Sequence, residues 1–126
     1  MTDEILDLPK TIRKVGELPG LRACLLSTAD GLKLAGDLDD QSLEQTISTM
    51  VPAVFHQARS KFAGTGLGRL ETITLCFSQH QISAFIQGKF CLTVLHDGRP
   101  FKPGVREKIQ AVTSELATLN TLDQEP

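Results

Sequence analysis

The chain has 126 residues, a formal net charge of −2 and a pI near 5.9. This charge argues against a nucleic-acid partner, because a phosphate backbone attracts basic proteins, and the chain has no Trp or Tyr for stacking bases. A length of this order is typical of one domain that buries roughly two-thirds of its unfolded surface. We expect a single domain over residues 1–126, with a core at about 9–119 and a loose tail at 120–126.

The first third of the chain predicts a helix and two strands. Apolar residues recur at helical spacing from Ile5 to Val15, and Gly16 ends the pattern. Residues 21–27 are apolar on both alternating faces, as in a central strand. A turn then leads into a second strand at 32–35, so these two strands are predicted to form a hairpin.

The middle of the chain predicts one long helix. Asp40 is a good N-cap residue, and the glycines at 64, 66 and 68 end the helix. Pro52 lies inside this helix and predicts a kink, because proline removes a backbone hydrogen bond. The apolar face of the helix comprises Leu43, Ile47, Met50, Val51, Val54, Phe55, Ala58 and Phe62.

The remainder of the chain predicts three strands and a final helix. Residues 70–77 alternate between two faces, and the β-rich runs 82–87 and 90–96 follow after short connections. A narrow apolar stripe over residues 105–119 predicts the helix. The order α-β-β-α-β-β-β-α, with neighbouring strands joined by tight turns or one helix, predicts an α+β fold. Its core is a central five-stranded antiparallel sheet with helices on both faces.

Three local sequences, taken with this order of elements, carry a resemblance to a known family. They are Leu18–Leu21 (LPGL), Ser27–Leu32 (STADGL) and Leu67–Glu71 (LGRLE). Residues 9–119 resemble the Roadblock (dynein light chain) family, whose domains are profilin-like sandwiches. The bacterial MglB-like type is one candidate subfamily, although no feature matches the chain to a single subfamily.

The resemblance implies a dimer and a protein partner. Roadblock domains pair their third strands edge to edge, which joins two five-stranded sheets and places the two long second helices side by side. Many of these domains are partners of Ras-like GTPases, including the MglB type that regulates a polarity GTPase. The dynein light chains of the family bind a motor subunit instead.

The third strand and the long helix also carry interface features of their own. No Lys or Pro lies between Thr72 and Phe77, although such residues usually protect a sheet edge. The apolar stripe of the helix spans roughly 140°, which is wider than a helix needs to cover one sheet. The alternatives are an edge hidden by a loop and a stripe buried entirely against its own sheet. The predicted dimer interface comprises Glu71, Thr72, Thr74, Cys76, Val51, Phe55, Ala58 and Phe62, and the predicted partner-binding residues are Thr49, His56 and Arg59.

No motif in the sequence supports catalysis, a cofactor or a metal site. Gly64–Gly68 (GTGLG) follows a helix, whereas phosphate-binding loops precede one, so we interpret it as a helix cap and loop. His56, His80 and His96 have no second ligand at metal-binding spacing. No serine lies in a Gly-x-Ser-x-Gly motif, and no two carboxylates have a recognisable acid–base spacing. We therefore expect a protein that is not an enzyme.

The cysteines indicate a reducing compartment, and the apolar runs are too short to span a membrane. Cys24, Cys76 and Cys91 are an odd number and are set among apolar residues, which favours reduced, buried thiols. Cys24 and Cys91 could lie close together on neighbouring strands, although we interpret both as small core residues. The longest apolar run, Met50 to Phe55, has six residues, far below the roughly 20 that a membrane-spanning helix needs. We expect a cytoplasmic location without membrane insertion.

The sequence therefore favours a non-catalytic homodimeric platform that binds a small Ras-like GTPase. Acceleration of GTP hydrolysis and pairing with a paralogue both stay open. One alternative is a structural scaffold subunit of a larger complex, such as a motor-associated light chain. Another is a small-molecule sensor, because layered sandwiches of this size can hold a ligand between helix and sheet. The expected inner faces argue against the sensor, since Leu, Ile and Phe fill them.

Overall fold

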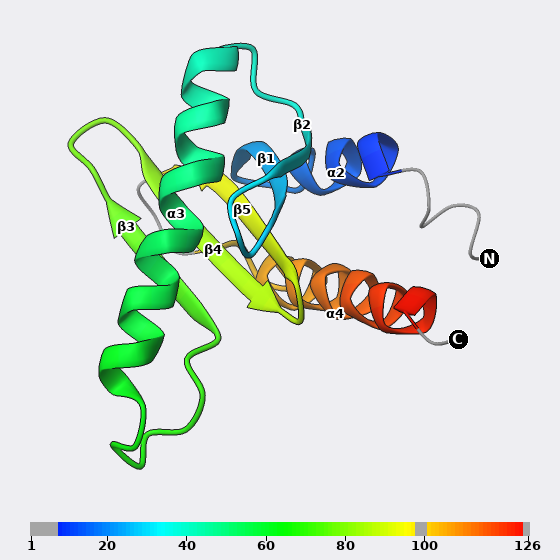
Figure 1. Ribbon diagram of the computed structural model, residues 1–126. Helices are drawn as coiled ribbons and strands as arrows, with labels where there is room; N and C mark the ends of the chain where they lie inside the picture. The colour runs from blue at the N-terminus through cyan, green and yellow to red at the C-terminus, as the bar shows by residue number, and fades with distance from the viewer. Residues whose placement is uncertain (1–7, 98–100, 125–126) are drawn as a thin grey trace.

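The computed structural model describes residues 8–97 and 101–124, and their elements follow the predicted order (Figure 1). Ile5, which the sequence pattern assigned to the first helix, lies outside the described residues. None of the described helices combines the length and the hydropathy needed to cross a bilayer. In chain order the elements are α2 (Leu8–Gly16), β1 (Leu21–Thr28), β2 (Lys33–Gly36), α3 (Gln41–Phe62), β3 (Thr72–Cys76), β4 (Gln81–Gln87), β5 (Phe90–His96) and α4 (Val105–Gln124).

The strands form one antiparallel sheet in the order β2-β1-β5-β4-β3. Helix α3 covers one face of this sheet, and α2 and α4 cover the other (Figure 1). The three central strands are buried on both faces, whereas β2 and β3 form the two edges. The predicted α+β class and the five-stranded antiparallel sheet are confirmed.

Each face of the sheet has its own hydrophobic core. Beneath α2 and α4, Phe85 and Leu92 pack with Ile109. Beneath α3, Phe55 packs with a different set of strand residues that includes Leu95. Successive residues of a strand point to opposite faces, so the central strands need apolar side chains at almost every position. This requirement explains the continuous apolar runs in β1 and β5.

Polar contacts fix the N-terminal end of α3. The side chain of Asp40 accepts a 3.0 Å hydrogen bond from the backbone N–H of Leu43, which confirms the predicted N-cap. The buried carboxylate of Glu44 accepts hydrogen bonds from Lys33 Nζ at 2.6 Å and from the backbone N–H of Leu38 at 3.2 Å. These contacts hold the β2 edge of the sheet against α3.

Helix α3 continues unbroken through the buried Pro52. Because proline has no N–H, the carbonyl of Ser48 loses its usual donor four residues later. The β1–β2 turn packs against this point of the helix, and a Cβ atom on Gly31 would lie 3.4 Å from the oxygen of Ser48. Gly31 has a φ of 98°, so both its conformation and its close approach to α3 favour glycine.

Two element boundaries differ from those that the sequence pattern predicted. Strand β3 has five residues, because Leu70 and Glu71 precede it and Phe77 lies at the turn, where its N–H donates to the carbonyl of His80. Helix α4 extends to Gln124, so most of the segment 120–126 that was predicted as a loose tail continues the helix.

The positions of the three cysteines differ from those expected from the sequence. Cys24 and Cys91 are buried on opposite faces of the sheet, because the register pairs Cys24 with Val94 and Cys91 with Ser27. Burial raises the pKa of the Cys91 thiol to about 11 and also raises the pKa of Cys24, so both thiols stay protonated near neutral pH. Cys76 is exposed, which differs from the burial that the sequence favoured.

Asp37 makes the stability of the fold depend on pH. Its Oδ1 accepts a 2.7 Å hydrogen bond from the backbone N–H of Cys24, and partial desolvation raises its pKa above the ordinary value of 3.8. A carboxyl whose pKa rises on folding destabilises the folded state when it ionises, so this cost develops as the pH increases from 3.8 through the folded pKa.

The variant Asp37→Asn keeps an acceptor oxygen and removes the charge. We expect its free energy of unfolding to be closest to that of the wild type at about pH 3 and to exceed it increasingly toward about pH 7. Urea unfolding followed by circular dichroism at each pH measures the difference. A difference between the two proteins that does not change with pH would contradict this role for Asp37.

Candidate functional site

Strand β3 offers a free edge for pairing with another strand. The backbone N–H of Phe77 donates to the carbonyl of His80 at 2.8 Å, on the side of β4. Because hydrogen bonding alternates along an antiparallel strand, the backbone groups of Thr72, Thr74 and Cys76 point away from β4. Within the described residues no strand pairs with this side of β3. The edge position that the sequence argument required is therefore present.

A series of hydrogen-bonded polar side chains connects β3 to the neighbouring strands β4 and β5. The hydroxyls of Thr74 and Ser83 lie 2.7 Å apart, and Ser83 Oγ lies 2.8 Å from His96 Nε2. His96 Nδ1 in turn lies 3.1 Å from the carbonyl oxygen of Asp97. Ser83 and His96 are buried, so their contact links β3, β4 and β5 and fixes the position of the edge strand.

The exposed surface of α3 beside this edge lacks charged side chains. Residues 45–58 of the helix contain no Asp, Glu, Lys or Arg, and neither do residues 72–79 around β3. A solvated helix face normally carries such residues, whereas the centres of protein interfaces are depleted of them. We call β3 together with the exposed face of α3 the edge surface.

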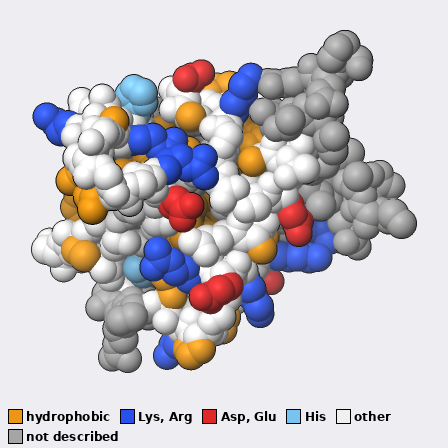
Figure 2. All heavy atoms as spheres, turned by 90° about the horizontal axis from the view of Figure 1, so that it is seen from below, with side chains coloured by type: hydrophobic (Ala, Val, Ile, Leu, Met, Phe, Trp, Pro, Cys, Tyr) orange, Lys and Arg blue, Asp and Glu red, His pale blue; other side chains and the backbone are white. Residues whose placement is uncertain are grey.

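Large apolar side chains are exposed on the edge surface. The exposed fractions are 58% for Met50, 52% for Phe62 and 59% for Phe77. In the space-filling view, hydrophobic side chains gather on the flank of the molecule that carries α3 and β3 (Figure 2). Exposed apolar residues that occur together in this way mark interaction sites more often than residues that occur singly.

An open groove of about 590 Å³ lies between α3 and the end of β3. None of its described lining residues is an Asp, Glu, Lys or Arg. Its apolar walls include Leu43, Ile47, Met50 and Val54 from α3 and Leu75 and Phe77 from the β3 side. The groove belongs to the edge surface and is open to an apolar group from another molecule.

Arg59 joins the other end of α3 to the segment that leads into β3. Its guanidinium Nη2 donates to the carbonyl oxygen of Leu70 at 2.8 Å, and its Cζ lies 5.3 Å from the ring centroid of Phe55. The cation and the ring attract each other at this distance. These contacts hold the side chain within the protomer, and the role of Arg59 in partner binding stays a prediction.

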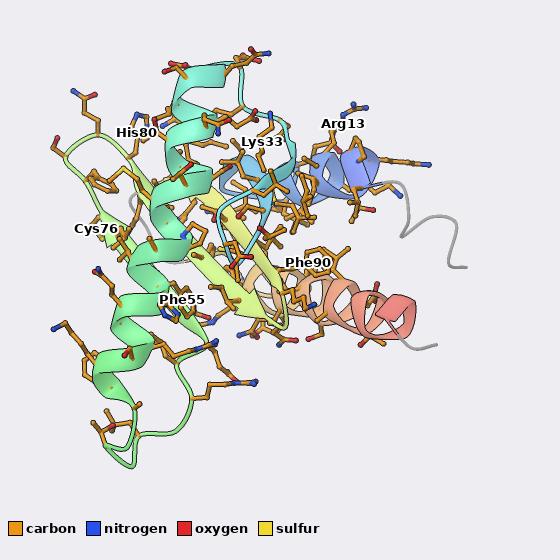
Figure 3. All side chains as sticks on the ribbon, viewed as in Figure 1. Arg13, Lys33, Phe55, Cys76, His80 and Phe90 are labelled. Atoms are coloured by element: carbon orange, nitrogen blue, oxygen red, sulfur yellow. The ribbon has the colours of Figure 1, made fainter. Side chains whose placement is uncertain are left out.

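The predicted interface residues fall into two groups. Thr72, Thr74 and Cys76 share one face of the free edge strand, the exposed Glu71 precedes them, and Cys76 and His80 lie at the outer end of the sheet (Figure 3). On α3, Phe62 is exposed and Ala58 is half-buried. Their role in a dimer stays a prediction.

Two helix residues correct the predicted interface. Val51 and Phe55 are buried within the protomer, and Phe55 extends from α3 toward the sheet (Figure 3). They stabilise the core under α3, and Val51 also lines the groove between α3 and β3. Thr49 and His56, two of the predicted partner-binding residues, are exposed on α3.

The interface prediction omitted several exposed apolar residues. Met50 and Val54 belonged to the recognised apolar stripe of the helix but were left out of the interface. Leu67, which is 77% exposed, lies in the loop after α3, and Phe77 follows β3. For Leu67 the available signal was a large apolar residue in a predicted loop, whereas Phe77 was assigned to the third strand.

The described residues offer no obvious centre for metal chemistry. No group of three His, Cys, Asp or Glu side chains among them is arranged to hold a metal ion. Gly64, Gly66 and Gly68 have positive φ values, and they follow the C-terminal end of α3 at Phe62. The loop therefore faces a helix end that presents carbonyl groups, as the sequence analysis expected.

Comparisons of sequence and of structure give different results. No protein-family model and no curated protein matches the sequence. Among solved structures, a Roadblock/LC7 domain from Streptomyces avermitilis matches with a TM-score of 0.78 and 14% identity, over 91% of this chain and 98% of that chain. Myxococcus xanthus MglB matches with a TM-score of 0.80 and 13% identity, over 98% of this chain and 95% of that chain. The chain has the Roadblock/LC7 fold.

The fold of this chain is also similar, with a lower score, to that of profilin. Acanthamoeba castellanii profilin II matches with a TM-score of 0.52 and 12% identity, over 83% of this chain and 94% of that chain. The lower score agrees with a shared sandwich of helices on both faces of a sheet. The sequence resemblance to the Roadblock family is thus confirmed by structural similarity, and that similarity establishes the fold.

Proposed function

We propose that this Roadblock domain is a non-catalytic homodimer that binds a small Ras-like GTPase on its paired α3 helices. One observation carries the proposal: an open edge strand adjoins an uncharged helix face with exposed apolar side chains. A second copy of β3 satisfies the outward backbone groups of Thr72, Thr74 and Cys76, and thereby extends the sheet into the second protomer.

The symmetry of this pairing produces the platform. Two antiparallel β3 strands are related by a twofold axis perpendicular to the sheet, and such an axis keeps both α3 helices on the same face. The helices then lie side by side and bury apolar groups such as Met50 and Val54 between them. Thr49 and His56, which are exposed on α3, belong to the surface that remains for a partner.

The proposed partner follows from the Roadblock resemblance, and the surface chemistry is compatible with it. A platform of this kind regulates a GTPase in trans when it binds the GTP-bound and GDP-bound states with different affinities. Regulation by differential affinity requires no catalytic residue from the platform. The scaffold alternative has the same fold and dimer but lacks this dependence on nucleotide.

Affinity capture from the native lysate tests the proposed partner. The immobilised protein is incubated with lysate in the presence of a GTP analogue or of GDP, and the retained proteins are identified. We expect one Ras-like GTPase to be enriched in one nucleotide state. The variant Thr49→Arg should abolish this enrichment, because it places a charge on the uncharged face of α3.

A matched control and two contradicting outcomes complete this test. Glu107→Lys changes the charge of an exposed residue on α4, on the opposite side of the sheet, and should retain the GTPase. Equal recovery of large structural proteins in both nucleotide states would contradict the GTPase proposal and favour a scaffold. A small molecule that survives purification on the protein would favour the sensor.

A further inference from the structure

The two ends of the edge surface differ in shape. The groove lies where the N-terminal half of α3 meets the end of β3, between residues such as Leu43 and Phe77. At the opposite end, Arg59 ties the C-terminal part of α3 to Leu70, just before β3 begins. Helix α3 and strand β3 therefore run side by side in opposite directions (Figure 1).

The opposite end carries exposed apolar side chains, which border a second and smaller hollow of about 370 Å³. Phe62 is the last residue of α3 and is 52% exposed, and Leu67 in the following loop is 77% exposed. Both side chains belong to the end of the protomer that Arg59 holds against the start of β3. Each protomer thus has an apolar groove at one end of the edge surface and exposed apolar side chains at the other.

A twofold axis brings these two ends together. In the proposed dimer we place the axis at Thr74, the central residue of β3, where it reverses both β3 and α3 in the second copy. Phe62 of the second copy then approaches the N-terminal end of α3, where Leu43 forms one end of the groove. We propose that Phe62 of each protomer fills the groove of the other, so that a second copy of this chain is the occupant of the groove. This inference rests on the proposed dimer and adds the contact that sets its affinity and register.

Self-complementarity favours a second copy over an unrelated partner. A twofold interface uses the same patch on both chains, so the groove and the exposed Phe62 on one patch are each used twice. Neither the described lining of the groove nor Phe62 carries a charge, so the contact leaves no buried ion without a partner. It also removes the exposed apolar side chains Met50 and Phe77 from water.

Cross-linking between two differently labelled chains tests this contact directly. One chain carries Leu43→Cys and the other carries Phe62→Cys, and both carry Cys76→Ser so that the exposed native thiol does not react. Cys24 and Cys91 are buried and serve as unreactive background. We expect a short-span thiol cross-linker to join the two chains in the mixture. Either chain alone should give little product, because the axis places identical positions at opposite ends of the interface.

The dimer dissociation constant provides a second measurement. Phe62→Ala should raise it about tenfold or more, because each dimer loses two buried rings. Leu32→Ala is the matched control, since Leu32 is 66% exposed in the turn before β2 at the other edge of the sheet, and it should leave the constant unchanged. Sedimentation equilibrium measures both constants, and circular dichroism checks the fold of each variant.

The outcomes separate this inference from the proposed dimer. If the wild-type protein is a dimer but the Leu43→Cys and Phe62→Cys chains do not cross-link and Phe62→Ala leaves the dissociation constant unchanged, the groove contact is overturned and the dimer stands. A wild-type protein that does not associate would overturn both. A cross-link that forms only in the mixture, together with weaker association of Phe62→Ala, supports the contact even if one cysteine variant folds poorly.

Discussion

Replacing Thr74 by proline is expected to convert the proposed dimer into a folded monomer. The backbone N–H of Thr74 points away from β4, so the protomer does not use it, whereas the paired strand of a second copy does. Proline removes this donor, and it is tolerated at a sheet edge where the N–H faces solvent. The variant therefore tests association while the fold of the protomer is kept.

The expected effect of Thr74→Pro on association is large. With the twofold axis at Thr74, the two chains exchange two hydrogen bonds there, and both bonds are lost along with the pairing of two carbonyls. We expect a cost of about 2 to 4 kcal/mol, which raises the dissociation constant about 30- to 1,000-fold. Light scattering over a concentration series measures this change, and circular dichroism confirms that the variant is folded.

Thr74→Val is the control for this substitution. It also lacks the hydroxyl that contacts Ser83 at 2.7 Å, but it keeps the backbone donor and favours strand structure. We expect it to remain a dimer. A folded Thr74→Pro protein with the dissociation constant of the wild type would show that β3 is not the pairing strand.

Phe55→Ala is expected to destabilise the protomer more than any substitution on the edge surface. Phe55 is 0% exposed, packs in the core under α3 and contacts the guanidinium of Arg59. Removing its ring leaves a cavity, and such substitutions lower the free energy of unfolding by about 3 to 5 kcal/mol. The measurement is urea unfolding in the Thr74→Pro background, where dimerisation makes no contribution.

Phe62→Ala in the same background is the matched comparison. The two phenylalanines belong to the same apolar stripe of α3, but Phe62 is 52% exposed. We expect Phe62→Ala to cost less than about 1 kcal/mol in the monomer. Similar losses from both substitutions would contradict the division of the stripe into a core part and an interface part.

The division of the α3 stripe into a core part and an interface part explains what could be predicted from the sequence. Helical periodicity identified the apolar stripe of α3, because burial against a sheet requires apolar residues at helical spacing. The period does not show how wide a stripe the sheet covers, so Val51 and Phe55 were assigned to an interface although they complete the core. The width of the stripe correctly indicated that some apolar residues, such as Met50, stay exposed.

The pattern of apolar residues also predicted the strands of the sheet, but it did not predict how neighbouring strands are aligned. Runs that are apolar on both faces identified the central strands, because helices cover the sheet on both sides. Cys24 and Cys91 lie on adjacent strands, but their faces depend on a register that the runs do not encode, since apolar residues occupy both faces of each strand. The groove was likewise beyond the sequence, because α3 and β3 form it from residues far apart in the chain.

The molar mass of the unmodified protein in solution tests the central claim most directly. Static light scattering at micromolar concentration should give about twice the chain mass of 13.7 kDa, because the free β3 edge and the uncharged face of α3 pair with a second copy. At about 1 mM even an interface of about 4 kcal/mol is half populated. A protein that keeps the mass of one chain up to about 1 mM would contradict the dimer and the platform built on it.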